Sequence, residues 1–226
     1  NEACCFLDKC YFSDNRLTDK FGTAIQVSAG HLCVNNSTFV DNVGDTGVIN
    51  GGGAFLIVNT TVVLDANDKA NYAFRCESNN GKGSRLINNV FMTEKPSGAG
   101  MNVNHDSPDL TSFGGNIFQS IQYGDNSNKN ASIFTPAATD VLKSVSGTLT
   151  DEGWVYSPSG VMSNYVTYNN IADAVKGFNP TISASYSGLG NTFFEWVTEQ
   201  GFKVDYRGNA RNVSKLQPGS YDSNLN

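Results

Sequence analysis

Residues 34–39 read Val-Asn-Asn-Ser-Thr-Phe and hold the arrangement that decides the fold, two apolar residues five positions apart around asparagine. On a straight strand, side chains an odd number apart point to opposite faces, so two core residues at this spacing require a corner between them. Asparagine tolerates left-handed backbone and bonds its own backbone in turns. The stretch therefore predicts two short strands that meet at an asparagine corner.

This spacing recurs through the first half of the chain. The pairs are Leu7 with Phe12, Val34 with Phe39, Val58 with Val63, Leu86 with Phe91, and Phe113 with Phe118. Their first members lie 27, 24, 28 and 27 residues apart, and the chain is rich in the corner-forming residues, with 28 Asn and 23 Gly. A coil of this length cannot bury its apolar side chains alone, so successive coils are expected to stack.

Stacking as parallel strands about 4.8 Å apart places the first members of the pairs in one interior column and the second members in another. The sequence therefore predicts an all-β fold, a parallel β-helix or solenoid. The consensus leucines of leucine-rich repeats and the length and Trp-Asp signature of WD40 blades do not occur. Residues 1–123 are expected to form the coils, and residues 124–226 to continue the solenoid and cap it as part of one unit.

The second half carries helical patterns. Helices are expected at Ala137 to Val145, at Ile171 to Lys176 and at Phe193 to Gln200. In the last of these, Phe193, Trp196 and Val197 share one face. We expect that face to cover an open end of the solenoid, because an uncapped end exposes core and strand edges.

Charge and hydropathy limit the partners. The net charge of −6 disfavours nucleic acid and anionic membrane surfaces, since phosphate binding needs clustered Lys and Arg. The longest apolar run, residues 54–58, is far shorter than the roughly 20 residues of a membrane-spanning helix. The chain begins at Asn1 without a signal-peptide pattern, and the first core pair lies almost at that end, so we expect a monomer or part of a longer chain.

Five cysteines give an odd count without a C-x-x-C spacing, which disfavours a zinc or redox site. They are expected to act as small buried apolar side chains. An adjacent Cys4–Cys5 bridge is geometrically poor, so only Cys10, Cys33 and Cys76 are plausible neighbours.

Specific motifs resemble known families. Residues 12–15 with 22–25, and 39–42 with 47–49, resemble the F-x-x-N and G-G-A-I signatures of the polymorphic outer membrane protein repeat. Residues 205–222 resemble the D-x-x-G-x-x-R…G-A-Y ending of secreted β-helix proteins from Gram-negative bacteria in the pectin-lyase-like superfamily. The resemblance implies a right-handed β-helix, export, and surface or periplasmic residence. It implies no particular reaction, because such folds host lyases, glycosidases, adhesins and autotransporter passengers.

Three aspartates, Asp14, Asp41 and Asp65, lie two residues past the second core position and are expected to form one column. Stacked carboxylates repel unless they are solvated or bridged by a cation. They are candidates for Ca²⁺ binding or for acid/base work on a glycan, with Asp41 and Asp65 the catalytic candidates. The alternative is that they belong to the repeat and face water.

Two other groups carry weaker signals. Oxygen-bearing side chains at Asn102, Asn104, Asp106 and Asp109 are candidate Ca²⁺ ligands, or an ordinary polar turn. Arg75, Lys82 and Arg85 form the only compact basic group of this half, and Arg75 and Arg85 are the candidates for a lyase base; the alternative is that they are solvated.

Aromatic residues are also concentrated where no motif matches. Trp154, Tyr156, Tyr165 and Tyr168 either form a sugar-stacking platform or pack against the solenoid. Neither histidine lies in a nucleophile motif.

These patterns favour a secreted or cell-surface β-helix that binds a glycan or another surface partner without catalysis. A polysaccharide lyase or glycoside hydrolase acting on an extended carbohydrate is the alternative, and a purely structural spacer is a third. No cofactor other than Ca²⁺ is suggested.

Overall fold

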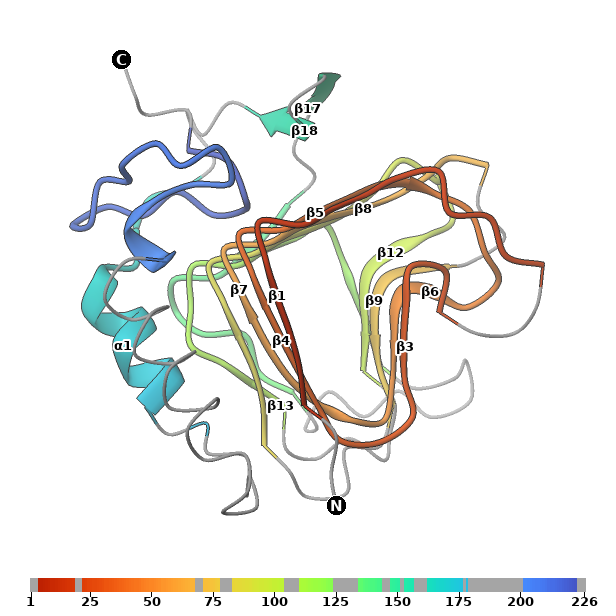
Figure 1. Ribbon diagram of the computed structural model, residues 1–226, viewed down its shortest axis with the longest axis horizontal. Coiled ribbons are helices and arrows are strands. Elements are labelled where there is room, and N and C mark those ends of the chain that lie inside the picture. Colours follow the sequence, from red (N-terminus) through yellow and green to blue (C-terminus); the bar gives the residue numbers. More distant parts are fainter. Residues whose placement is uncertain are drawn as a thin grey trace.

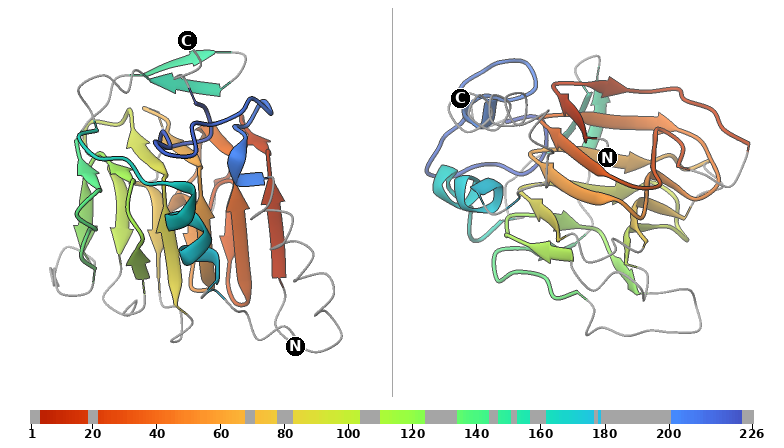
Figure 2. Two further views of the ribbon diagram at one scale, coloured as in Figure 1. Left: turned by 90° about the vertical axis from the view of Figure 1, so that its left-hand side faces the viewer. Right: turned by 60° about the horizontal axis from the view of Figure 1, so that its bottom comes forward.

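The chain winds as a right-handed parallel β-solenoid. A computed structural model describes residues 4–18, 22–67, 71–77, 83–103, 110–123, 134–143, 147–150, 153–156, 162–176, 178 and 201–222. Each turn adds one strand to each of three parallel sheets, and the chain passes the first and third sheets five times, which makes about four full turns. Seen from the N-terminal end, the chain runs clockwise as it recedes (Figures 1 and 2).

The three sheets form the walls of the solenoid. The first contains β1 (Cys4–Asp8), β4 (His31–Asn35), β7 (Ala54–Val58), β10 (Ser84–Ile87) and β13 (Leu110–Ser112). The second contains β2 (Tyr11–Phe12), β5 (Thr38–Asn42), β8 (Thr61–Leu64), β11 (Val90–Thr93), β14 (Ile117–Phe118) and β16 (Val141–Leu142). The third contains β3 (Ile25–Val27), β6 (Gly47–Gly51), β9 (Tyr72–Cys76), β12 (Ala99–Val103) and β15 (Ile121–Tyr123).

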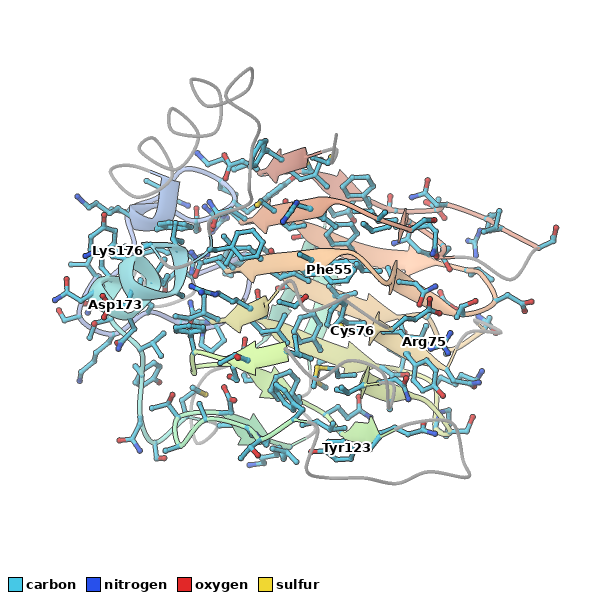
Figure 3. The ribbon with its side chains drawn as sticks, turned by 90° about the horizontal axis from the view of Figure 1, so that it is seen from below. Phe55, Arg75, Cys76, Tyr123, Asp173 and Lys176 are labelled. Carbon is cyan, nitrogen blue, oxygen red and sulfur yellow. The ribbon has the colours of Figure 1, made fainter. Side chains whose placement is uncertain are left out.

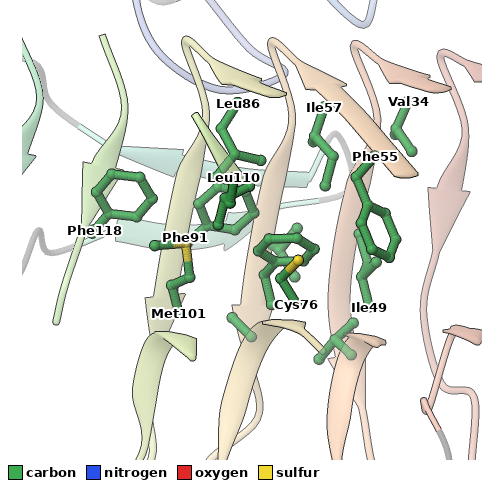
Figure 4. Close-up of a cluster of buried hydrophobic side chains, with 14 of the residues drawn as sticks. Val34, Ile49, Phe55, Ile57, Cys76, Leu86, Phe91, Met101, Leu110 and Phe118 are labelled. Atoms are coloured by element: carbon green, nitrogen blue, oxygen red, sulfur yellow. The ribbon is translucent and has the colours of Figure 1, made fainter. Parts of the chain in front are cut away.

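The interior columns confirm the five-residue spacing in four coils, one of them shifted by one residue, whereas the interior pair of the last coil is six residues apart. One column is Leu7, Val34, Ile57, Leu86 and Ser112, and the other is Phe12, Phe39, Val62, Phe91 and Phe118. Val34, Ile57 and Leu86 lie side by side in Figure 4. The Phe12 and Phe39 rings stack with centroids 4.6 Å apart, and the Phe91 and Phe118 rings with centroids 5.7 Å apart.

The predictions of Val58, Val63 and Phe113 as interior residues were wrong by one position. Val58 and Phe113 belong to the apolar layer outside the first sheet, and Val63 to the layer outside the second. Residues 54–58 and 62–64 are apolar at every position, because both faces of these strands are covered, so the same spacing fits two registers.

The corner between the first and second sheets has left-handed backbone. Asn36, Asn59 and Asn88 occupy it on consecutive coils with φ of 47°, 48° and 59°, and all three are fully buried. We call these three residues the asparagine corner. Gly114 and Gly115, with φ of 98° and 70°, make the same corner in the next coil. Asparagine therefore occupies turns whose left-handed backbone costs most other residues conformational energy.

The outer faces of two sheets are covered by the C-terminal half. The helix α1 (Tyr168–Lys176), the 3₁₀ helix η1 (Gly201–Lys203) and Leu216 pack on the first sheet through Ile171, Val175 and Phe202 (Figure 2). Met162 and Tyr165 pack on the second sheet. A separate antiparallel hairpin consists of β17 (Gly147–Thr150) and β18 (Gly153–Tyr156).

The helix prediction at Ile171 to Lys176 is confirmed, whereas the one at Ala137 to Val145 was wrong. Val141 and Leu142 instead form β16, which pairs with β14 and extends the second sheet. The four-residue stretch Ala137–Asp140 is a turn fixed by Asp140, whose Oδ2 accepts the Ala137 N–H at 2.7 Å. The segment Phe193 to Gln200 lies outside the described residues.

Cys5, Cys10, Cys33 and Cys76 lie in different surroundings. Cys33 and Cys76 are buried, as predicted, but Cys5 is exposed and Cys10 partly exposed. Cys33 faces the outer apolar layer of the first sheet while Cys76 faces the interior core, so the proposed neighbourhood of Cys10, Cys33 and Cys76 is wrong.

Candidate functional site

An accessible group of acidic side chains lies at the corner after the second sheet. Asp14, Asp65 and Glu94 follow β2, β8 and β11, and Asp41 is the last residue but one of β5, so one acidic residue lies on each of four consecutive coils. We call these four residues the acid row. Asp14 and Glu94 are exposed and Asp41 and Asp65 half-buried, so the row is open to solvent.

Backbone hydrogen bonds fix the spacing of the acid row. The Asp14 N–H donates to the Asp41 carbonyl at 3.2 Å, and the Glu94 N–H donates to the carbonyl of Leu64 at 2.9 Å. Asp14 and Asp41 both have left-handed backbone, with φ of 57° and 53°. Asp14 and Asp41 are therefore carried on adjoining coils by the same left-handed backbone, whereas Asp65 and Glu94 are not left-handed.

A bulge changes the predicted column. The pairing of β5 with β8 shifts after Phe39, so that Asn42 rather than Asp41 pairs with Leu64. Val40 and Asp41 therefore face the single residue Val63, and the register places Asp65 level with Val43, two residues past Asp41. Sequence spacing could not show this shift, and it also missed Glu94, which lies three rather than two residues past its core phenylalanine.

The carboxylates of the row repel one another. The pKa of Asp41 is raised by partial burial and by the charges of Asp65 and Asp14, with Arg16 opposing. The pKa of Glu94 is raised by partial burial and by the charges of Asp41 and Asp65. Asp14 forms an ion pair with Arg16 at 3.1 Å, in which both side chains are exposed. Such a row is suited to accept hydrogen bonds from hydroxyl or ammonium groups.

The basic candidates do not come together. Arg75 lies on β9 in the third sheet and Arg85 on β10 in the first. The prediction that these two residues belong to one compact basic group was therefore wrong. Figure 3 shows Arg75 on the flank opposite α1, the helix that carries Asp173 and Lys176. Lys82 is outside the described residues.

Each arginine already has a structural role. The Arg75 Nη1 donates to Glu77 Oε1 at 2.8 Å. In the third sheet, Arg75 pairs with Asn50 on one neighbouring strand and with Asn102 on the other. The Arg85 Nη1 donates to the Ala174 carbonyl at 2.6 Å, and its guanidinium lies 5.1 Å from the Phe113 ring centroid. Burial lowers the pKa of Arg85. Arg85 therefore ties α1 to the solenoid.

The calcium candidates are only partly described. Asn102 is fully buried in β12, while Asn104, Asp106 and Asp109 fall outside the described residues. Within the described chain, no group of three or more His, Cys, Asp or Glu side chains is arranged to hold a metal ion.

The aromatic candidates that can be placed are packed. Tyr165 lies against the apolar layer of the second sheet and Tyr168 against that of the first, where Lys203 Nζ lies 5.0 Å from the Tyr168 ring centroid. These two tyrosines therefore follow the packing alternative. Trp154 and Tyr156 lie in β18, and their side chains are outside the described part.

Among the described helices, none is both long and apolar enough to cross a membrane. The chain has no significant match among protein-family models, curated proteins or solved structures. The function must accordingly be argued from the acid row and its surroundings.

Proposed function

We propose that the protein is a glycan-binding module, secreted or held at the cell surface, and that the acid row is its binding surface. The observation that carries this proposal is the presence of one accessible carboxylate on each of four consecutive coils. The row runs along the solenoid axis with a repeat of about 4.8 Å per coil, the spacing of neighbouring strands. An extended polymer laid along the axis would meet a carboxylate at regular intervals.

Two further features support a carbohydrate. Carboxylates accept hydrogen bonds from vicinal hydroxyls, and these bonds are stronger than those to neutral acceptors. The surface belongs to rigid strands and tight corners, so little order has to be gained on binding.

We also propose a family and a cellular location for the protein. The likeness to pectin-lyase-like β-helix proteins with polymorphic outer membrane protein repeats is supported by the right-handed coil and by the folded state of residues 201–222, in which Asp205 and Arg211 of the motif are both buried. We propose export from a Gram-negative cell on the same ground. Detection of the native gene product in envelope or culture-supernatant fractions tests this, and its confinement to the cytoplasm would contradict it.

Glycan-array binding of the full chain tests the proposed function, with titration of any array ligand to follow. The double variant Asp41→Asn/Asp65→Asn keeps side-chain size but removes two charges of the row. Asp173→Asn, at an exposed position of α1 outside the first sheet, is the matched control. Loss of binding in the double variant alone supports the proposal, whereas a parent chain that binds no glycan overturns it.

A glycoside hydrolase is the second candidate, because Asp41 has a raised pKa and lies beside the charge of Asp65. One protonated and one ionised carboxyl group is the pair that glycoside hydrolysis uses. Reducing-sugar release from a polysaccharide panel, with and without Ca²⁺, tests this reaction. Turnover that Asp41→Asn abolishes would replace the binding-only function by the hydrolase.

The lyase alternative has less support in the described chain. Arg75 is paired with Glu77, and Arg85 is bound to Ala174 on another sheet. The acid row would also repel a polyuronate substrate. Absence of unsaturated products, measured by ultraviolet absorbance in the same panel, is the expected result.

A further inference from the structure

Two tyrosines from opposite ends of the chain lie together at the N-terminal end of the acid row. The Tyr11 and Tyr206 ring centroids are 6.4 Å apart, with ring planes inclined at 45°. Among the described residues, Tyr11 is one of the large hydrophobic side chains that are exposed, at 39%, and Tyr206 is half-buried. An aromatic residue left open on a strand next to polar groups is a feature of binding surfaces.

A tight turn holds Tyr206 in this place. Asp205 is fully buried, and its Oδ1 accepts the N–H groups of Arg207 and Asn209, each at 2.9 Å. Gly208 has φ of 86°, a conformation that suits glycine. The Tyr206 N–H donates to the Ser220 carbonyl at 2.7 Å. The ring of Tyr206 is therefore presented from a rigid turn and not from a free loop.

Arg211 fixes this turn to the solenoid. It is 4% exposed, and its Nη2 donates to Asn36 Oδ1 in the asparagine corner at 3.0 Å and to the Gly219 carbonyl at 2.8 Å. Its Nε donates to the Val204 carbonyl at 3.0 Å, immediately before the turn. The D-x-x-G-x-x-R motif thus sets the position of Tyr206 relative to β2.

The tyrosine pair adjoins the acid row, because Tyr11 lies on β2 only three residues before Asp14, whose N–H donates to the Asp41 carbonyl at 3.2 Å. The pKa of Tyr11 is raised by partial burial and by the charges of Asp41, Tyr206 and Asp14, with a hydrogen bond to Ser13 opposing. The Arg207 guanidinium lies over the Tyr221 ring, 4.1 Å from its centroid, so a second aromatic ring stands beside the turn. Aromatic faces and carboxylate acceptors consequently share one surface.

We propose that Tyr11 and Tyr206 form a sugar-stacking subsite at the end of the acid row, specific for pyranose chains that are uncharged or carry amino groups and not for uronate chains. A pyranose ring offers an apolar face to the tyrosines and hydroxyl donors to the carboxylates. A uronate would place its charge beside Asp14 and Asp41, where like charges are already close. This inference rests on the proposed glycan-binding function and adds the class of sugar to it.

Titration of the full chain with cellohexaose, a glucosamine hexamer and a galacturonate hexamer tests the subsite. The parent is expected to bind cellohexaose or the glucosamine hexamer, and to bind the galacturonate hexamer more weakly. Tyr206→Ala and Tyr11→Ala should each weaken binding about tenfold, the order expected for loss of one aromatic contact. Tyr206→Phe keeps the ring and should stay near the parent.

The outcomes separate the two proposals. If the parent binds none of these chains and no array glycan, the proposed function fails. If the parent binds and Asp41→Asn/Asp65→Asn weakens binding while both tyrosine variants match the parent, only the subsite is overturned. Equal affinity for the galacturonate hexamer overturns the assigned sugar class. Thermal unfolding of each variant shows that a loss of affinity is not a loss of fold.

Discussion

At the residue scale, the fold depends on left-handed backbone at the asparagine corner, and the sequence places at these positions a residue that tolerates it. Asn59 is fully buried with φ of 48°, and its Oδ1 accepts the side-chain N–H of Asn88 at 2.7 Å. Asn88 in turn donates to the Gln217 carbonyl at 2.9 Å. The corner therefore needs a residue that tolerates positive φ and also bonds its neighbours along the solenoid axis.

Substitution of Asn59 separates these two requirements. Asn59→Gly keeps the backbone conformation but loses the amide contacts, whereas Asn59→Ala loses the contacts and also carries about 1 kcal/mol of left-handed strain. We expect Asn59→Ala to be the more destabilised of the two in denaturant unfolding. The usual order in strands and helices is the reverse, so a glycine variant less stable than the alanine variant would show that the corner does not require positive φ.

At the element scale, residues 201–222 act as a strap across the asparagine corner (Figure 1). Besides Arg211, the strap contributes the Gly201 carbonyl, which accepts from Asn36 Nδ2 at 2.7 Å, and Ser220, whose Oγ lies 2.6 Å from Thr38 Oγ1. Gly219 has φ of 92° and would place a Cβ 2.6 Å from Thr61 Oγ1. The strap thus fits the corner closely through polar contacts.

Arg211→Lys tests the strap. A lysine cannot reproduce the planar set of donors and leaves buried carbonyls without partners, so we expect a loss of roughly 2–4 kcal/mol in the free energy of unfolding. Arg207→Lys, at the exposed arginine of the same motif, is the control and should change stability little. Equal effects of the two variants in denaturant unfolding would argue against a special role for Arg211.

The stacking of the coils could be predicted from the sequence, but the register of individual strands could not. The five-residue spacing and the corner asparagines predicted parallel stacking and the columns of Leu7, Val34 and Phe39. The register of Val58 and Val63 could not be predicted, because strands covered on both faces are apolar at every position. The strand at Val141–Leu142 was also missed, since two residues carry no periodic signal.

The candidate site was predictable only in part. The repeat placed Asp14, Asp41 and Asp65 near one another, because each follows a core phenylalanine or valine at one corner. Tyr206 could not be placed beside Tyr11, since that contact depends on tertiary docking of the Arg211 motif.

At the scale of the whole molecule, several carboxyl groups have a pKa above the ordinary value. Burial is the first cause of the raised pKa of Asp8, Asp41, Glu94 and Asp140. Each folded-state pKa lies above the ordinary 3.8 of aspartate or 4.5 of glutamate. The stability that these groups contribute is fully present below the ordinary values and is lost as the pH rises through the folded-state values.

Mild acidification should therefore stabilise the protein. We expect Tm to rise as the pH is lowered from neutral toward the folded-state pKa values of these four groups, and Asp41→Asn/Glu94→Gln to show a smaller rise. Thermal unfolding at stepped pH measures both. A Tm of the parent that falls on the first step below neutral would contradict this expectation.

The central claim is that a linear row of carboxylates on the solenoid corner binds an extended glycan. Titration of the best array glycan against the parent, Asp41→Asn/Asp65→Asn and Asp173→Asn tests it most directly. We expect Asp173→Asn to bind like the parent and the double variant to bind at least about tenfold more weakly, because it has lost two charge-assisted hydrogen bonds. Full affinity in the double variant, or no glycan bound by the parent, would contradict it.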